Sequence, residues 1–245
     1  MIKNRYNSSI GLIKWSLIRH KFYIPAFVIV QILLSVAVIY GFSFITNAVD
    51  NISRTFLCTG AITMNIIAVT CVLSPQIVSE AKQNGVLDYQ KTLPISRIGI
   101  IMSDLLIWGV TSLPGICVSM IVGTINFNMN VQINIVSCLS LIFIITALTF
   151  FGFSIAYLFP SNIMALITQV VMIGGLLFSP IVYSKDRLPL WMAHIYNYLP
   201  FVPVSNIIRF ILFGLDNFNI MNYIVILFWG FISFLSSMYV LTRRK

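Results

Sequence analysis

Long apolar runs alternate with short polar intervals along the whole chain. Six of these runs hold about 20 or more mostly apolar residues, enough for a helix to cross a hydrocarbon core about 30 Å thick. They cover residues 22–46, 56–78, 98–123, 133–159, 163–183 and 219–241 approximately. The pattern predicts an all-α integral membrane protein with six transmembrane helices, in a single transmembrane domain that spans residues 1–245.

The polar interval between the second and third runs, Ser79–Arg97, carries charges of alternating sign. Val86, Tyr89 and Leu93 are spaced by three and four residues, so a helix here has one apolar stripe. Pro94 disfavours helical geometry in the residue before it and is expected to end this helix. We therefore predict a short amphipathic helix outside the membrane, between two spans.

Residues 4–21 form a basic segment that contains a tryptophan. Ile10, Ile13 and Leu17 fall on one helical face, and a basic amphipathic helix of this kind lies in the membrane interface rather than across the membrane. We predict such an N-terminal interfacial helix. A simple basic anchor for the next span is the alternative. No cleavable signal peptide is expected, because the first apolar run is about twice as long as a typical signal core.

Two apolar pieces between the fifth and sixth runs, Leu188–Leu199 and Val204–Leu215, contain 12 residues each. This length is too short to cross a membrane and is typical of re-entrant segments. Pro200 and Pro203 lie between them and prevent one continuous helix. We predict two short external re-entrant helices. As one kinked span, they would give seven crossings and would place the termini on opposite sides.

The basic residues favour six spans with both termini in the cytoplasm, because cytoplasmic loops carry an excess of Lys and Arg. In that layout four basic residues are external: Arg54, Lys185, Arg187 and Arg209. The other eleven are cytoplasmic: Lys3, Arg5, Lys14, Arg19, Lys21, Lys82, Lys91, Arg97, Arg243, Arg244 and Lys245.

Composition excludes a soluble domain. The 245 residues are 59% hydrophobic and 9% charged, with a mean hydropathy of +0.97, whereas soluble domains have about 25% charged residues. The excess of 15 Lys and Arg over six Asp and Glu is typical of nucleic-acid binding as well. In a chain this apolar we attribute it to membrane topology and expect no nucleic-acid partner.

Motifs of enzymatic chemistry are missing from the chain. The sequence contains no Gly-Lys pair and therefore no phosphate-binding P-loop. It contains no H-E-x-x-H and no G-x-S-x-G. His20 and His194 are far apart, so we expect no metal site. We interpret the four cysteines as small buried hydrophobic residues: Cys58, Cys71, Cys117 and Cys138.

Asp104 is the main ionisable residue inside a predicted span. Ion-coupled carriers bury several such groups, so we interpret Asp104 as an interface residue paired with a cytoplasmic cation; a transport role is the alternative. Five amides and hydroxyls lie inside spans, where they either join helices or line a cavity: Gln31, Asn65, Thr146, Thr149 and Gln169.

Two segments resemble those of type-2 ABC exporter permeases. The first is Glu80, then Gly85-Val86-Leu87-Asp88, then Thr92-Leu93-Pro94-Ile95-Ser96, with Val86 where the family has Thr and Asp88 where it has Glu. The second is Ser179-Pro180-Ile181-Val182-Tyr183, then Leu188-Pro189-Leu190-Trp191, then Tyr198-Leu199-Pro200 and Arg209, with Leu199 where the family has Asn. The resemblance covers nearly the whole chain.

The resemblance implies two permease chains, identical or different, that work with two cytoplasmic ATPase chains. ATP and Mg are used by the ATPase, so the permease binds no cofactor and has no catalytic residue. The residues implied in ATPase coupling are Glu80, Gly85, Val86, Leu87, Tyr89, Leu93 and Pro94. Those implied in the external gate half-helices are Pro189, Trp191, Pro200, Pro203 and Arg209.

The expected function is export of a lipophilic or amphiphilic substrate, such as a drug-like compound or a lantibiotic-type antimicrobial peptide, across a bacterial plasma membrane. Three alternatives stay open: export of a lipid-linked glycan, an ion-coupled carrier or channel, and a sensor or scaffold that binds an ATPase without transport.

Overall fold

The computed structural model describes residues 2–46, 50–93, 95–175, 179–184, 188–215 and 217–242, and the side chains in these ranges except those of residues 2–10, 45, 46 and 190. All regular structure in these ranges is helical, which confirms the predicted all-α class. The elements are α1 (Ile2–His20), α2 (Tyr23–Val36), η1 (Ala37–Gly41), α3 (Phe42–Thr46), α4 (Asn51–Ile67), η2 (Ala68–Leu73), α5 (Ser74–Gln83), α6 (Val86–Thr92), α7 (Arg97–Phe127), α8 (Ile135–Leu158), η3 (Ser161–Ile163), α9 (Met164–Ile173), α10 (Leu190–Tyr198), α11 (Phe201–Phe213) and α12 (Ile220–Thr242).

Five stretches of the described chain are long and apolar enough to cross a membrane: Tyr23–Phe44, Asn51–Gln83, Arg97–Phe127, Ile135–Leu158 and Ile220–Thr242. They confirm the first four predicted spans and the last one, although the second begins earlier and ends later than predicted.

The predicted fifth span, 163–183, differs from the structure. The helix there is Ser161–Ile173, residues 176–178 lie outside the described residues, and residues 179–184 form turns and bends. Pro180 has no backbone N–H with which to continue a helix. The end of this span was therefore wrong, and six crossings stay a prediction.

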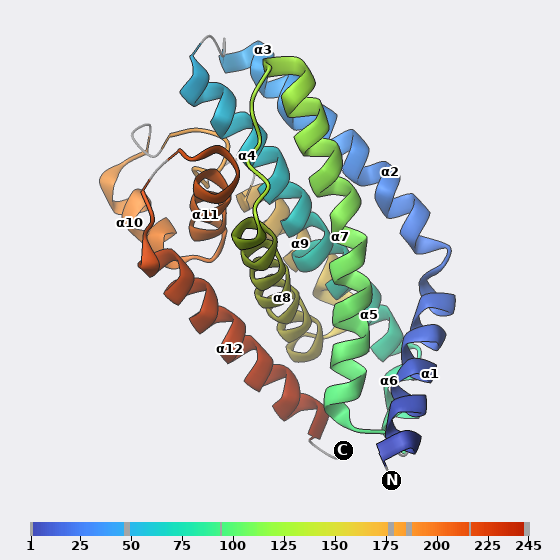
Figure 1. The fold of residues 1–245 in the computed structure, drawn as a ribbon. Coiled ribbons are helices and arrows are strands. Elements are labelled where there is room, and N and C mark those ends of the chain that lie inside the picture. Colours follow the sequence, from blue (N-terminus) through green and yellow to red (C-terminus); the bar gives the residue numbers. More distant parts are fainter. Residues whose placement is uncertain are drawn as a thin grey trace.

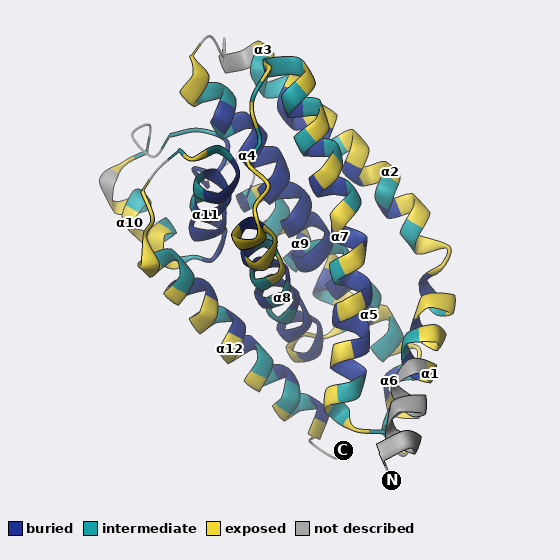
Figure 2. Cartoon of the chain, viewed as in Figure 1, coloured by how far each residue is buried: buried dark blue, intermediate teal, exposed yellow. Residues whose placement is uncertain are grey.

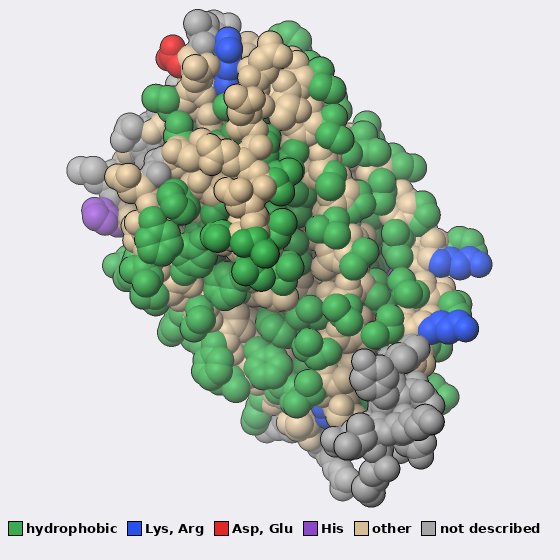
Figure 3. Space-filling view, in the orientation of Figure 1, with side chains coloured by type: hydrophobic (Ala, Val, Ile, Leu, Met, Phe, Trp, Pro, Cys, Tyr) green, Lys and Arg blue, Asp and Glu red, His purple; other side chains and the backbone are tan. Residues whose placement is uncertain are grey.

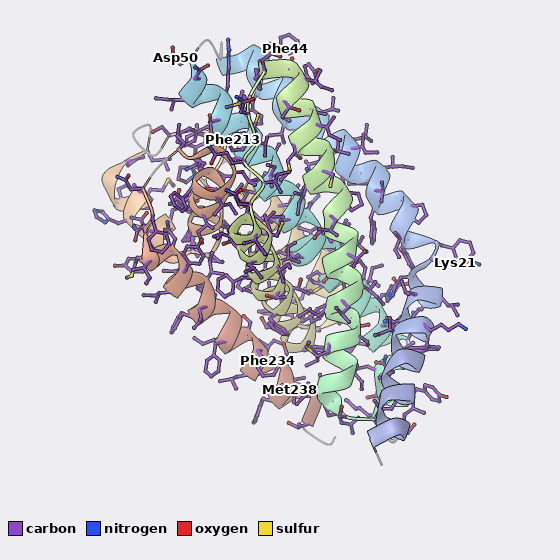
Figure 4. All side chains as sticks on the ribbon, in the orientation of Figure 1. Lys21, Phe44, Asp50, Phe213, Phe234 and Met238 are labelled. Atoms are coloured by element: carbon purple, nitrogen blue, oxygen red, sulfur yellow. The ribbon has the colours of Figure 1, made fainter. Side chains whose placement is uncertain are left out.

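The helices form one elongated bundle with two ends (Figure 1). We call them the α6 end, where α6 lies, and the α3 end, where α3 and the start of α4 lie. Both the start of α1 and the last turn of α12 lie at the α6 end. Figure 4 places Phe213, the last residue of α11, in the same half of the molecule as Asp50, which precedes α4. Helix α11 therefore belongs to the α3 half.

The continuous helical stretch α4–η2–α5 is the centre of the bundle. In its most apolar window 83% of the residues are buried, against 22% for Tyr23–Phe44, and Figure 2 shows α4 enclosed by its neighbours. Gly152 of α8 lies so close to η2 that a Cβ atom there would collide with the carbonyl of Thr70. The outer surface is apolar over most of the face drawn in Figure 3, as expected of a multi-pass membrane protein.

Helix α1 packs lengthwise on α7. Its buried face consists of Leu12, Ser16 and His20, whereas Leu17 is 45% exposed and Ile13 is partly exposed. The predicted stripe of Ile10, Ile13 and Leu17 is therefore not the buried face, because Ser16 bonds to Asp104 of α7 and His20 packs on Trp108 of α7. The side chain of Ile10 lies outside the description. The interfacial position of α1 stays a prediction.

Two smaller predictions also need correction. Cys58 and Cys71 are buried as predicted, but Cys117 and Cys138 are exposed, because α7 and α8 turn them toward the outer surface of the bundle.

The break between α10 and α11 falls at Leu199–Pro200, and Pro203 lies in the first turn of α11. Proline fits there because the first turn has N–H groups without an intrahelical acceptor.

Candidate functional site

The turn between α5 and α6 depends on one glycine. Gly85 has φ +73°, a left-handed conformation that glycine adopts without the penalty a Cβ imposes. Its N–H donates to the carbonyl of Lys82 at 3.3 Å, and its own carbonyl accepts from the N–H of Tyr89 at 3.0 Å. The turn thus ends the central helix and starts α6, where the sequence predicted a short amphipathic helix.

The buried residues of α6 are not those of the predicted apolar stripe. Leu87 and Gln90 are the buried residues of this helix, whereas Tyr89 is 59% exposed. Val86 is half-buried, and Leu93 follows the last helical residue. The register is set by the turn at Gly85, which the apolar spacing alone does not show. Pro94 lies outside the described residues.

Lys82 ties this turn to the end of α8, a contact that its place in the sequence does not indicate. Its Nζ donates to the carbonyl oxygens of Tyr157 at 2.9 Å and Phe159 at 3.1 Å. These are carbonyls at a helix C-terminus, where a cation is favourable. Ser79 adds a second tie, because its carbonyl accepts from Ser161 Oγ at 2.9 Å. The end of the central helix is therefore fixed to the α8–α9 connection.

Asp104 joins α7 to α1. Its Oδ1 accepts a hydrogen bond from Ser16 Oγ at 2.8 Å and pairs with Arg19 at 3.5 Å. Beside them, the ring of the buried His20 meets Trp108 edge to face at 5.1 Å. This confirms that Asp104 pairs with a basic residue of α1. Spacing could not have shown it, since the partners are 85 residues apart in the chain.

The surroundings of His20 favour its neutral form. Burial and the charge of Arg19 lower its pKa, and Asp104 and the bond to Ser16 only partly oppose them. Nδ1 lies 2.7 Å from the carbonyl oxygen of Ser16, which can only accept, so Nδ1 carries the proton. Nε2 of the neutral ring is then an acceptor, and in the described structure it is buried without a partner.

Arg209 of α11 binds two segments of the α3 half at once. Its guanidinium donates to the carbonyl of Ile181 at 3.0 Å and to Thr59 Oγ1 of α4 at 3.3 Å. It also lies 3.9 Å over the ring of Phe56 and is 2% exposed. Arg209 therefore holds α11 and the segment before α10 against the central helix.

The remaining residues of the predicted external helices differ in their position along the helices and in their exposure. Pro189 and Pro200 directly precede the first residues of α10 and α11. Pro203 is buried, and Trp191 is 63% exposed. Helix α10 is held to α12 because Trp229 Nε1 donates to the carbonyl of Tyr198 at 2.8 Å.

A buried polar cluster joins α2, α4 and α7 near the middle of the bundle. Asn65 Nδ2 donates to Ser35 Oγ and to Ser119 Oγ, both at 2.9 Å, and Gln31 bonds the backbone of α7. Of the alternatives for these amides, joining helices is the one that the contacts of Gln31 and Asn65 support. Gln169, in contrast, is exposed.

Comparison with known families matches the ABC-2 type transporter family over residues 13–213. The match includes the α5–α6 turn and α11 and stops before α12. No curated protein matches the chain.

Proposed function

Because the chain belongs to the ABC-2 type transporter family and is the membrane permease subunit of an ABC transporter, we propose that it exports its substrate with energy from separate ATPase subunits. In this proposal the chain crosses a bacterial plasma membrane six times, with the α6 end and both termini in the cytoplasm. ATP and Mg bind to the ATPase, and a second permease chain completes the transporter.

The α5–α6 turn is the observation that supports this proposal most directly. A short helix with an exposed face directly follows the most buried stretch of the bundle, whose end is fixed to α8 through Lys82. A force on α6 therefore acts on the central helix. An ATPase that changes shape on binding ATP can use such a helix, and we assign Glu80, Gly85 and Tyr89 to this coupling surface. Leu87 is buried and packs α6 against the bundle.

The other end of the same central stretch contacts the proposed gate. Thr59 of α4 accepts a hydrogen bond from Arg209 of α11, and Gly60 lies against Val182, with a Cβ position 3.1 Å from the Val182 Cα. The π-helical segment η2 lies between the two ends, and such segments are frequent at functional sites. We propose that displacement of α6 reaches α10 and α11 along this path.

The proposed substrate is lipophilic or amphiphilic, such as a drug-like compound or an antimicrobial peptide. The support is the scarcity of charges in the spans: among the described residues the candidate spans contain few ionisable side chains, and Asp104 is paired with Arg19 of α1. Without a set of buried proton or ion sites, an ion-coupled carrier is disfavoured.

The experiment is purification of the tagged chain from its native membranes in mild detergent, followed by mass spectrometry of the proteins that accompany it. We expect a stoichiometric ATPase with a P-loop. Gly85→Ala should lose this partner, because alanine is strained at φ +73° and distorts the turn. Gly11→Ala is the matched control, since its Cβ also meets open space but its φ is not left-handed.

Retention of the ATPase by both glycine variants would remove the assigned role of the turn. Absence of any ATPase, even after cross-linking in the membrane, would contradict the exporter itself.

A further inference from the structure

A pocket of about 240 Å³ lies between α1 and the α5–α6 turn. Its walls carry polar and apolar groups: Arg19, His20, Tyr23, Ile77, Glu80, Ala81, Asn84 and Val86. The volume is below the 300–1,000 Å³, approximately, of sites for drug-sized ligands. The pocket is thus of a size for a small polar group rather than for a whole drug-like molecule.

The two walls of the pocket carry opposite charges, Arg19 on α1 and Glu80 on α5, that do not form an ion pair with each other. Arg19 on α1 pairs with Asp104 of α7 at 3.5 Å, and among the described residues Glu80 on α5 has no ion pair within 4.0 Å. The side chain of Arg19 is 20% exposed and lines the pocket, so its guanidinium can donate to an anion there. The pocket therefore offers a donor for an anion on one side and an acceptor for a cation on the other.

The acceptor side of the pocket is the carboxylate of Glu80. His20 belongs to the wall of the pocket but is fully buried, so it shapes the wall rather than binding a ligand. A carboxylate suits a cation that has N–H groups to donate. A primary ammonium meets this requirement, and a quaternary ammonium does not.

The pocket also lies beside the ends of two candidate spans. It lies between Tyr23, where the first candidate span begins, and Glu80, close to Gln83, where the second ends. Lys21, which follows His20 in the chain, points away from the bundle (Figure 4). Basic and aromatic side chains at the ends of spans are typical of the membrane–water interface.

We propose that this pocket binds the headgroup of a phospholipid with a primary ammonium and a phosphate, as in phosphatidylethanolamine. Glu80 accepts from the ammonium, and the guanidinium of Arg19 donates to the phosphate. Ile77, Ala81 and Val86 contact the carbon atoms next to the phosphate. A bound lipid would then set the spacing between α1 and the α5–α6 turn.

The test uses the purified, delipidated full chain in detergent, without any ATPase. Native mass spectrometry measures retention of phosphatidylethanolamine, phosphatidylcholine and phosphatidylglycerol with identical acyl chains. We expect one phosphatidylethanolamine per chain, held about tenfold more tightly than either other lipid, since each of them lacks the N–H donors of a primary ammonium.

Two variants and a control make the test specific. Glu80→Gln removes the charge of the exposed side chain at nearly constant size and should abolish most of the preference, whereas Glu80→Asp should retain it. Asp88→Asn is the control, because this exposed carboxylate on α6 pairs with Lys91 outside the pocket. Equal retention of the three lipids, or equal losses in Glu80→Gln and Asp88→Asn, would overturn the proposal. Since no ATPase is present, failure to capture one leaves this result unaffected.

Discussion

The side-chain amide of Gln31 spans one backbone turn of α7 at Gly115. Gln31 Oε1 accepts from the N–H of Gly115 at 2.6 Å, and Gln31 Nε2 donates to the carbonyl of Thr111 at 2.9 Å. Pro114 lies inside this turn, where a proline removes a backbone hydrogen bond and crowds the preceding turn. Helix α2 thus stabilises α7 at its weakest point, and the absence of a side chain on Gly115 makes room for the amide.

Gln31→Leu should therefore destabilise the bundle. It removes both hydrogen bonds between the helices while keeping a similar volume. We expect a loss of about 1–2 kcal/mol in the free energy of unfolding, since each net hydrogen bond contributes about 0.5–1.5 kcal/mol. Unfolding in mixed detergent measures it. Gln169→Leu, at an exposed position, should be nearly neutral, and equal losses in the two variants would contradict the assigned role.

The contact between α8 and η2 permits no side chain at residue 152. In Gly152→Ala the new Cβ meets the backbone carbonyl of Thr70, which cannot rotate away as a side chain would. We expect a loss of about 1–3 kcal/mol in unfolding free energy, as for other overpacked cores, with a lower midpoint in thermal unfolding. Gly174→Ala meets open space and is the control. A stable Gly152→Ala variant would show that the π-helical segment shifts to accommodate it.

Lys82 should protect the last turn of α8 from opening. Lys82→Met keeps the aliphatic length but removes the donors to the carbonyls of Tyr157 and Phe159. Hydrogen exchange of the peptide that contains residues 153–160 should become faster, by about tenfold if one net hydrogen bond of roughly 1.4 kcal/mol is lost. Lys91→Met is the control, because Lys91 pairs only locally with the exposed Asp88 and such pairs contribute little. Identical exchange in the two variants would argue against the tie.

Stability should fall as the pH is lowered below the ordinary pKa of histidine. Burial and Arg19 lower the pKa of His20 in the folded chain, against the opposing charge of Asp104, so between the two pKa values the unfolded chain binds more protons. The contribution of His20 to the free energy of unfolding is complete above its pKa in the unfolded chain, about 6.5. This contribution is lost as the pH falls toward the lower pKa of His20 in the folded chain. Each unit of lowering corresponds to about 1.4 kcal/mol.

Thermal unfolding at pH 7.5 and at pH 5 measures this dependence. His20→Asn keeps a donor near the Nδ1 position but does not titrate, so its decline toward low pH should be smaller than that of the parent chain. His194→Asn, on an exposed site of α10, should follow the parent chain. A parent chain and a His20→Asn variant with the same pH dependence would contradict the role of His20.

The sequence by itself determined which parts of the chain are helical and apolar. Runs of about 20 apolar residues can satisfy their backbone groups in a membrane only as helices or closed barrels, and five of the predicted spans follow from this. Pro200 could be recognised as an interruption because the restriction that a proline imposes is local. The resemblance to a transporter family also depended on short segments that the sequence shows directly.

Only the tertiary structure decided which faces of the helices meet. The buried face of α1 is set by Asp104 of α7, the register of α6 by the turn at Gly85, and the role of Lys82 by the end of α8 about 75 residues away. The spanning helices carry large apolar residues on exposed faces as well as on buried ones, so in them hydrophobic periodicity carries little information about which face turns inward. In such a chain the few polar contacts and the positions without a Cβ, such as Gly115 and Gly152, select the packing, and these depend on neighbours that are distant in the sequence.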